Sequence, residues 1–176
     1  KTTALVKTAV DAQKKGVLPV FIITEQKWDF PHAKLMGLDL DETVDEETGE
    51  IEYDGFFLFN NEFQYIEQIT DYINELIDAQ KKGELEYDLL FLWDSVGSVP
   101  CKMTFDGKGG KQHNASTLAD KIGMGINQRI SGSRRVDSEF TNTLVIVNQP
   151  WVELPDNPFS QPKIKAKGGE SIWLNS

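Results

Sequence analysis

Short unbroken apolar runs alternate along the chain with stretches whose apolar residues recur at helical spacing. The runs are rich in branched and aromatic residues, which is typical of strands covered on both faces. They comprise residues 18–24, 56–59, 89–93 and 142–149. Strands that alternate with helices predict βαβ units and therefore an α/β fold with a mostly parallel central sheet flanked by helices. We predict one domain over residues 1–176, a length that suits a single α/β core.

Four segments have the periodicity of helices. The clearest is residues 62–80, whose apolar stripe consists of Phe63, Ile66, Ile69, Ile73, Leu76 and Ile77. The others are residues 1–15, a short helix over 30–37, and the segment marked by Leu118, Ile122, Ile126 and Ile130. Gly16 and Gly83 are expected to end the helices that precede them.

Three segments have no hydrophobic period. The acidic residues 39–54 are expected to form a solvated turn before the strand at 56–59, while 98–115 and 150–167 are expected to be long loops. Loops of this length are usually functional or disordered. A further strand is expected to begin in ESIWLN (170–175).

Charge, hydropathy and cysteine content limit the partners and the compartment that we expect for the chain. A net charge of −10 argues against a surface that binds nucleic acid everywhere, but it leaves room for local basic sites. No apolar stretch is long enough to cross a bilayer, so no membrane partner is expected. The single cysteine, Cys101, cannot form an internal disulfide, which favours a reducing, cytoplasmic compartment.

Polar pairs follow three of the predicted strands directly: Thr24-Glu25, Asp94-Ser95 and Asn148-Gln149. In a parallel sheet, functional side chains gather beyond the carboxyl ends of the strands. Asp94 could hold a metal-bound water, Glu25 could orient or deprotonate a water, and Gln149 could sense an anion. Each pair alone could simply end a strand, whereas together they suit Mg²⁺–phosphate chemistry.

The first residues, KTT, are those that end the phosphate-binding motif G-x-x-x-x-G-K-[ST] at the start of a helix. In that motif Lys1 would reach the β- and γ-phosphates and Thr2 would coordinate Mg²⁺, with Thr3 beside them. The glycine loop itself is not in the sequence, so we expect phosphate binding by these 176 residues alone to be weakened or lost.

Four stretches together resemble the ATPase core of the RecA/UvsX recombinase family, over nearly all of the chain. They are FIITEQKWDFPHAKLMGLD, LLFLWDSVGSVP, VIVNQPW and KAKGGESIWLNS, the last with a glycine pair at Gly168 and Gly169. The resemblance implies a RecA-like P-loop fold that binds ATP and Mg²⁺. It also implies that Glu25 activates the attacking water and that Asp94, with Ser95 beside it, lies in the Mg²⁺ shell.

The same resemblance assigns further roles. Asp29 and His32 would contact the adenine, although the family commonly has a tyrosine where His32 stands. Gln149 would couple the γ-phosphate to the second DNA-binding loop. The long acidic stretch 41–55 and the proline-rich 150–167 favour a divergent, phage-like relative.

The two long loops would then bind single-stranded DNA near the axis of a helical filament. Their basic residues suit sequence-independent phosphate contact, and Phe105 and Trp151 could stack against bases. The basic residues are Lys102, Lys108, Lys111, Lys163, Lys165 and Lys167. The expected function is DNA-dependent ATP hydrolysis coupled to strand exchange and repair in a bacterial or phage-infected cell.

Two other functions remain open on the sequence alone. One is a hexameric helicase or motor of the DnaB kind, which shares the nucleotide chemistry but forms a ring. The other is a non-hydrolysing module that binds ATP or DNA within an assembly. A basic loop closed by a glycine pair after Asn148-Gln149 favours the recombinase.

Overall fold

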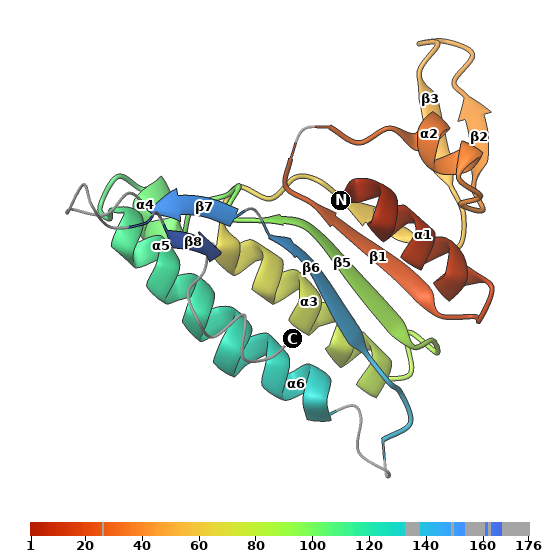
Figure 1. The fold of residues 1–176 in the computed structure, drawn as a ribbon. Helices are drawn as coiled ribbons and strands as arrows, with labels where there is room; N and C mark the ends of the chain where they lie inside the picture. The colour runs from red at the N-terminus through yellow and green to blue at the C-terminus, as the bar shows by residue number, and fades with distance from the viewer. Residues whose placement is uncertain (26, 133–137, 149, 154–160, 162, 167–176) are drawn as a thin grey trace.

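A four-stranded, all-parallel sheet lies at the centre of the computed structural model (Figure 1), which describes residues 1–25, 27–132, 138–148, 150–153, 161 and 163–166. Its strand order is β4-β1-β5-β6. The strands are β1 (Leu18–Ile23), β4 (Leu58–Asn60), β5 (Leu89–Val96) and β6 (Thr143–Asn148). The predicted α/β class with a parallel central sheet is confirmed, and the four strands predicted from the apolar runs are present.

Helices cover both faces of this sheet. The helices α1 (Thr2–Gln13) and α2 (Phe30–Leu35) belong to one apolar layer, and α3 (Ile66–Lys81) belongs to the other. A continuous helical segment packs beside α3 and consists of α5 (Lys111–Leu118), the π-helix η1 (Ala119–Ile126) and α6 (Asn127–Gly132). No helix in the described part of the chain combines the length and apolar character needed to cross a membrane.

Successive residues of the central strands enter opposite layers. In β1, Val20 and Ile22 join the core around α3, while Phe21 and Ile23 join the core around α1. Every residue of β1 and β5 is buried. This two-sided burial explains why these strands are unbroken apolar runs in the sequence.

The stripe predicted on α3 is confirmed, but the helix begins at Ile66, four residues later than its predicted start. The side chain of Gln68 determines this start, because its Oε1 accepts from the backbone N–H of Gln64 at 2.7 Å and of Tyr65 at 3.4 Å. Tyr65 is the N-cap, whose N–H the first turn leaves unpaired, and Gln64 directly precedes it. The apolar period therefore continues into the segment before the helix.

The prediction of a loop over 98–115 is wrong, because this segment contains α4 (Lys102–Phe105) and the first half of α5. Two side chains hold it in place, one from α3 and one from within the segment. The N–H of Lys102 donates to Glu67 Oε2 on α3, and the N–H of Cys101 donates to Asn114 Oδ1, both at 2.9 Å. Polar anchors of this kind produce no hydrophobic period.

Two segments that were predicted to be irregular, the acidic turn and the 150–167 loop, each contain a β-hairpin. The acidic stretch contains β2 (Asp41–Val44) and β3 (Ile51–Asp54), antiparallel strands that project from the body of the molecule (Figure 1). The predicted 150–167 loop contains the antiparallel strands β7 (Pro150–Glu153) and β8 (Lys163–Ala166). The strand expected in 170–175 lies outside the described residues.

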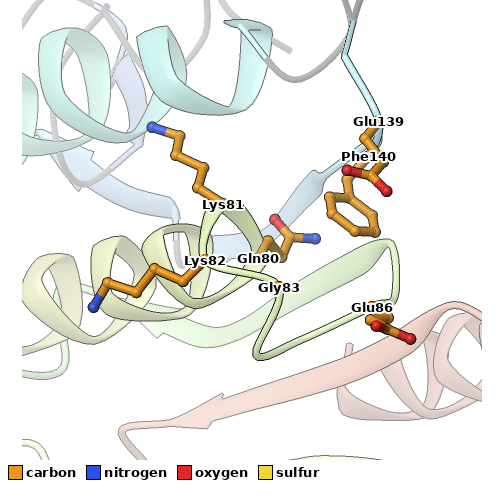
Figure 2. Close-up of a pocket in the computed structure, with 7 residues that line it drawn as sticks. All are labelled: Gln80, Lys81, Lys82, Gly83, Glu86, Glu139 and Phe140. Carbon is orange, nitrogen blue, oxygen red and sulfur yellow. The ribbon is translucent and has the colours of Figure 1, made fainter.

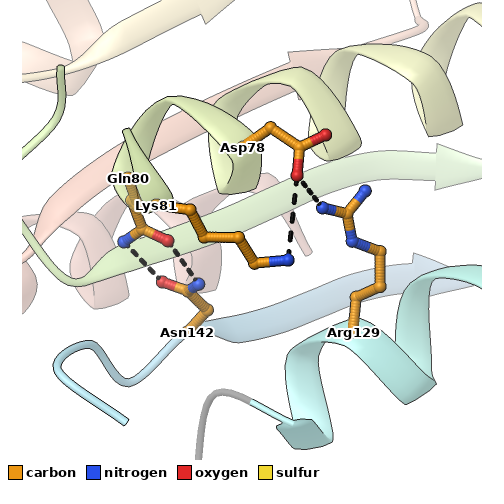
Figure 3. Close-up of polar contacts among 5 residues, drawn as sticks. All are labelled: Asp78, Gln80, Lys81, Arg129 and Asn142. Atoms are coloured by element: carbon orange, nitrogen blue, oxygen red, sulfur yellow. Dashed lines mark hydrogen bonds and ion pairs between the residues drawn. The ribbon is translucent and has the colours of Figure 1, made fainter. Parts of the chain in front are cut away.

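An amide pair ties the end of α3 to the amino ends of the central strands (Figure 3). Gln80 Nε2 donates to Asn142 Oδ1 at 3.0 Å, and Asn142 Nδ2 donates back to Gln80 Oε1 at 2.6 Å. The N–H of Leu89, the first residue of β5, also donates to Asn142 Oδ1 at 3.0 Å. Both amide side chains are buried, so neither can exchange these bonds for bonds to water without opening the structure.

Replacing Asn142 with alanine should lower the free energy of unfolding by about 3 kcal/mol, because it leaves buried groups of Gln80 and Leu89 without this partner. Urea titration of the variant against wild type measures the change. The matched control is Asn61→Ala at an exposed position, which should be nearly neutral. Equal losses in the two variants would contradict the role of the amide pair.

A charged contact lies beside the amide pair on α3. Asp78 accepts a short hydrogen bond from the Arg129 guanidinium of α6, and Lys81 Nζ lies 3.8 Å from the same oxygen (Figure 3). The hydrogen bond from Arg129 lowers the pKa of Asp78 below its ordinary value of 3.8, since it favours the ionised form. The contact links α3 to the helical segment packed against it.

Asp78→Asn should destabilise the protein at neutral pH, and the difference from wild type should disappear as the pH falls. The pKa of Asp78 is lowered in the folded state, so its stabilisation is complete above the unfolded-state value and is lost as the pH falls through the folded-state value. Unfolding titrations at neutral pH and at a series of acidic pH values measure this. Asp71→Asn, an exposed change on the same helix, is the control. A pH-independent difference would contradict the ion pair as its cause.

Candidate functional site

The carboxyl ends of β1 and β5 lie side by side, because the two strands are parallel neighbours. Their register pairs Ile23 with Asp94, and the N–H of Thr24 continues the pairing by donating to the Asp94 carbonyl at 2.8 Å. The side chains that follow the two strands therefore meet at one edge of the sheet. Ligands of open α/β sheets bind at this edge.

Asp94 is a buried carboxylate at this edge, with 6% of its surface exposed. Thr2 Oγ1 donates a hydrogen bond to its Oδ2 at 2.7 Å, although the two residues are 92 positions apart. A buried carboxylate is costly unless it is hydrogen-bonded, so the Thr2 hydroxyl stabilises it there. The first turn of α1 consequently lies against the end of β5.

Lys1 lies at the same edge, next to the end of β6. Its Nζ donates to the Asn148 carbonyl at 2.8 Å. Since β6 is the neighbour of β5, the ammonium is held beside the strand that carries Asp94. Thr3 lies exposed in the same first turn of α1.

Glu25 comes to this edge from β1 and contacts the residue after Asp94. Ser95 Oγ donates a short hydrogen bond to Glu25 Oε1, and Ser95 itself is buried. The peptide bond between Asp94 and Ser95 is cis. Five predicted site residues are thus brought together: Lys1, Thr2, Glu25, Asp94 and Ser95.

The oxygens of Thr2 and Asp94 fit part of a magnesium shell. Mg²⁺ binds oxygens at about 2.1 Å in octahedral geometry, so neighbouring ligands lie about 3 Å apart, and substrate phosphates and waters usually complete the shell. The 2.7 Å between Thr2 Oγ1 and Asp94 Oδ2 is near this spacing. Within the described ranges, no group of three or more histidine, cysteine, aspartate or glutamate side chains could hold a metal by itself.

Asp29 and His32 lie on α2, outside this cluster. Asp29 is the N-cap of the helix, where its Oδ1 accepts from the N–H of His32 at 2.9 Å. This bond is a structural role that the sequence analysis did not assign. Both residues are exposed, so both remain accessible to a ligand.

Sequence reasoning missed an aromatic cluster between Glu25 and α2. Trp28 lies 4.7 Å from the ring of Phe21 and 5.6 Å from that of Phe59, measured between ring centroids. Phe30 stacks on Tyr53 of β3 at 4.5 Å with an interplanar angle of 14°. The available signal was the recurrence of aromatic residues over 28–30 and 53–59.

Lys102 and Lys108, the predicted DNA-binding lysines whose side chains the structure describes, lie outside the carboxylate cluster. Lys102 and Lys108 are exposed on α4 and in the turn after it, and Lys102 Nζ lies 5.7 Å from the Tyr65 ring centroid. Phe105 is 52% exposed, with its ring 5.7 Å from that of Tyr65. Figure 1 shows α4, α5, β7 and β8 gathered at the end of the molecule where β5 and β6 end.

Other predicted DNA-binding positions are described only by their backbone. Lys111 is the first residue of α5 and Trp151 lies in β7, where it pairs with Lys165 of β8. Lys163 pairs with Glu153 in the same hairpin. Gln149 and Lys167 lie outside the described residues, as does the glycine pair Gly168-Gly169.

A pocket of about 630 Å³ lies at the opposite, amino-terminal edge of the sheet (Figure 2). Its lining comes from the end of α3, the turn after it and the segment before β6, and consists of Gln80, Lys81, Lys82, Gly83, Glu86, Glu139 and Phe140. None of the predicted site residues lines it. The candidate site is therefore the carboxylate cluster at the carboxyl edge and not this pocket.

The sequence matches no protein-family model, and no curated protein matches it.

Proposed function

We propose that this chain is the ATPase core of a RecA/UvsX-like recombinase, which hydrolyses Mg-ATP in response to single-stranded DNA and supports homologous strand exchange and repair. The proposal rests on one observation above the others. At the carboxyl edge of the sheet, Thr2 Oγ1 donates to the buried Asp94 Oδ2 at 2.7 Å, and Ser95, the next residue, donates to Glu25. Lys1, just before Thr2, is held at the same edge by the Asn148 carbonyl.

In the proposed reaction a water attacks the γ-phosphorus in line with the bond that breaks. The new bond joins the water oxygen to phosphorus, the β–γ bridging oxygen leaves with ADP, and Glu25 accepts the proton of the water. Ser95 Oγ holds Glu25 Oε1 and thereby orients the carboxylate. Phosphoryl transfer depends mainly on such positioning.

The other residues of the edge would bind the triphosphate. Thr2 and Asp94 would hold Mg²⁺, which neutralises phosphate charge when it is bound. The Lys1 ammonium would exchange the Asn148 carbonyl for phosphate oxygens. Asp29 and His32, exposed on α2, are the proposed adenine contacts, and Gln149 is the proposed sensor of the γ-phosphate.

The proposed DNA interface is the basic end of the molecule around α4 and the β7–β8 hairpin. Lys102 and Lys108 are exposed in this region and can attract phosphates locally, although the chain as a whole has a net charge of −10. The half-exposed Phe105 offers a ring for base stacking. The proposed partner besides DNA is a second copy of the chain in a helical filament, in the cytoplasm of a bacterial or phage-infected cell.

Glu25→Gln should lower DNA-stimulated ATP hydrolysis by about 10²- to 10⁴-fold, because the amide cannot accept the proton of the water. ATP binding should stay within a few-fold of the parent. The assay uses a chain in which a glycine loop precedes Lys1, with and without single-stranded DNA. Glu84→Gln, at an exposed position, is the control.

Hydrolysis by Glu25→Gln at the parent rate would contradict this role of Glu25. Hydrolysis indifferent to DNA, or none by the parent, would favour an assembly module instead of a recombinase. Electron microscopy with ATP and DNA then separates helical filaments from the closed rings of a helicase.

Replacing Lys102 and Lys108 with alanine should weaken binding to single-stranded DNA equally across sequences. If each lysine neutralises one phosphate, the slope of log K against log salt should fall in magnitude by about 1.4. Fluorescence anisotropy over a range of salt concentrations measures the slope. The control replaces Lys14 and Lys15, exposed after the end of α1. An unchanged slope would exclude α4 from the interface.

A further inference from the structure

The hydroxyl of Thr24 lies between the two strand ends that carry the carboxylates. Thr24 immediately precedes Glu25, and its Oγ1 accepts from the N–H of Ser95 at 3.1 Å and from Trp93 Nε1 at 3.4 Å. The same oxygen lies 3.0 Å from the Ser95 carbonyl and 3.3 Å from the Asp94 carbonyl. One side chain thus contacts the backbone on both sides of Ser95.

Ser98 completes this group of hydroxyls. Its Oγ makes a short hydrogen bond with Thr24 Oγ1 and lies 2.6 Å from the Ser95 carbonyl. A hydroxyl donates one hydrogen and accepts through two lone pairs. With Ser98 donating to the Ser95 carbonyl and Thr24 donating to Ser98, Thr24 can still accept from Ser95 and Trp93, so every hydroxyl hydrogen has an acceptor.

We infer that Thr24 is a positioning residue that fixes Glu25 and Asp94 relative to each other, a role that rests on the proposed ATP hydrolysis. It acts through Ser95. The bonds from Thr24 and Ser98 hold the Ser95 backbone, and Ser95 Oγ in turn holds Glu25 Oε1. Asp94, the residue before Ser95, is held on its other side by Thr2.

The backbone pairing of β1 with β5 does not require the Thr24 hydroxyl. Pairing of β1 with β5 extends from Leu18↔Leu89 to Ile23↔Asp94, and the backbone N–H of Thr24 adds a bond to the Asp94 carbonyl that a valine would keep. Thr24 itself is half-buried at the end of the strand. Loss of the hydroxyl should therefore alter the strand ends and leave the sheet in place.

The test compares Thr24→Val, which keeps the shape and removes the hydroxyl, with Thr24→Ser, which keeps the hydroxyl. In a chain with a glycine loop before Lys1, kcat for ATP hydrolysis should fall about 10- to 100-fold in Thr24→Val, the scale expected for small misplacement of reacting groups. KM for ATP should stay within about twofold, since the ligands of the triphosphate are unchanged. Thr24→Ser should restore most of the rate.

The control is Thr70→Val, which removes a buried hydroxyl that bonds only within α3 according to the contacts described. It should leave kcat unchanged. A Thr24→Val variant with wild-type kcat, while Glu25→Gln is inactive, would overturn the positioning role alone. A fall in kcat that merely matches the loss of folded protein would also overturn it. A parent chain without ATP hydrolysis would overturn the proposed function and this role together.

Ser98→Ala keeps the inference testable if Thr24→Val does not fold. Ser98 is exposed, so its replacement should preserve the structure while removing the donor to the Ser95 carbonyl. We expect kcat to fall about threefold to tenfold with an unchanged KM, a smaller loss of positioning than in Thr24→Val. Wild-type kcat in Ser98→Ala would then overturn the role.

Discussion

The parallel pairing of β1 with β5, in the register that places Ile23 opposite Asp94, determines where the polar groups of the carboxyl edge lie. Both strands are buried on both faces, so their side chains must enter the correct layers. A slip by one residue would move each side chain to the opposite face. It would also separate Thr24 from Ser95. The packing of the core thus sets the positions of the hydroxyls and carboxylates at the carboxyl edge of the sheet, outside the apolar layers.

Burial of Asp94 is acceptable because another part of the chain supplies its hydrogen bond. Thr2 comes from the first turn of α1, and α1 is held against the sheet by Leu5, Val6 and Ala9. The packing of α1 against the sheet and the hydrogen bonding of the Asp94 carboxylate are therefore coupled. A change that shifts α1 would deprive Asp94 of the Thr2 hydroxyl, even if it lies far from the sheet edge.

The central fold was accessible from the sequence because its signals are local. Unbroken apolar runs are typical of strands buried on both faces, and the chain has two at Val20 to Ile23 and Leu89 to Trp93. Polar residues directly after such strands must lie at one edge of a parallel sheet. This reasoning selected Glu25, Asp94 and Ser95 correctly as neighbours. It could not give the hydroxyl bonds of Thr24 and Ser98, which depend on side-chain directions at the ends of two strands.

The elements that sequence reasoning missed depend on contacts between distant residues. Glu67 holds the start of α4 and Asn114 holds Cys101, yet neither contact produces a period along the chain. In β2 all four residues are exposed, so no alternation of apolar and polar residues distinguishes it from a turn. The start of α3 was placed too early because Phe63 continues the apolar stripe while Gln68 caps a later turn.

The β2–β3 hairpin gives the molecule a pronounced electrical asymmetry. Residues 41–54 contain eight acidic side chains and no basic one, so of the ten net negative charges eight belong to the hairpin and two to all other residues. Figure 1 shows this arm and the lysine-bearing α4 at opposite ends of the molecule. The chain is in effect a nearly neutral body with a negative pole. In the field of any polyanion such a dipole turns its hairpin outward and its α4 end inward before contact is made, so orientation precedes binding.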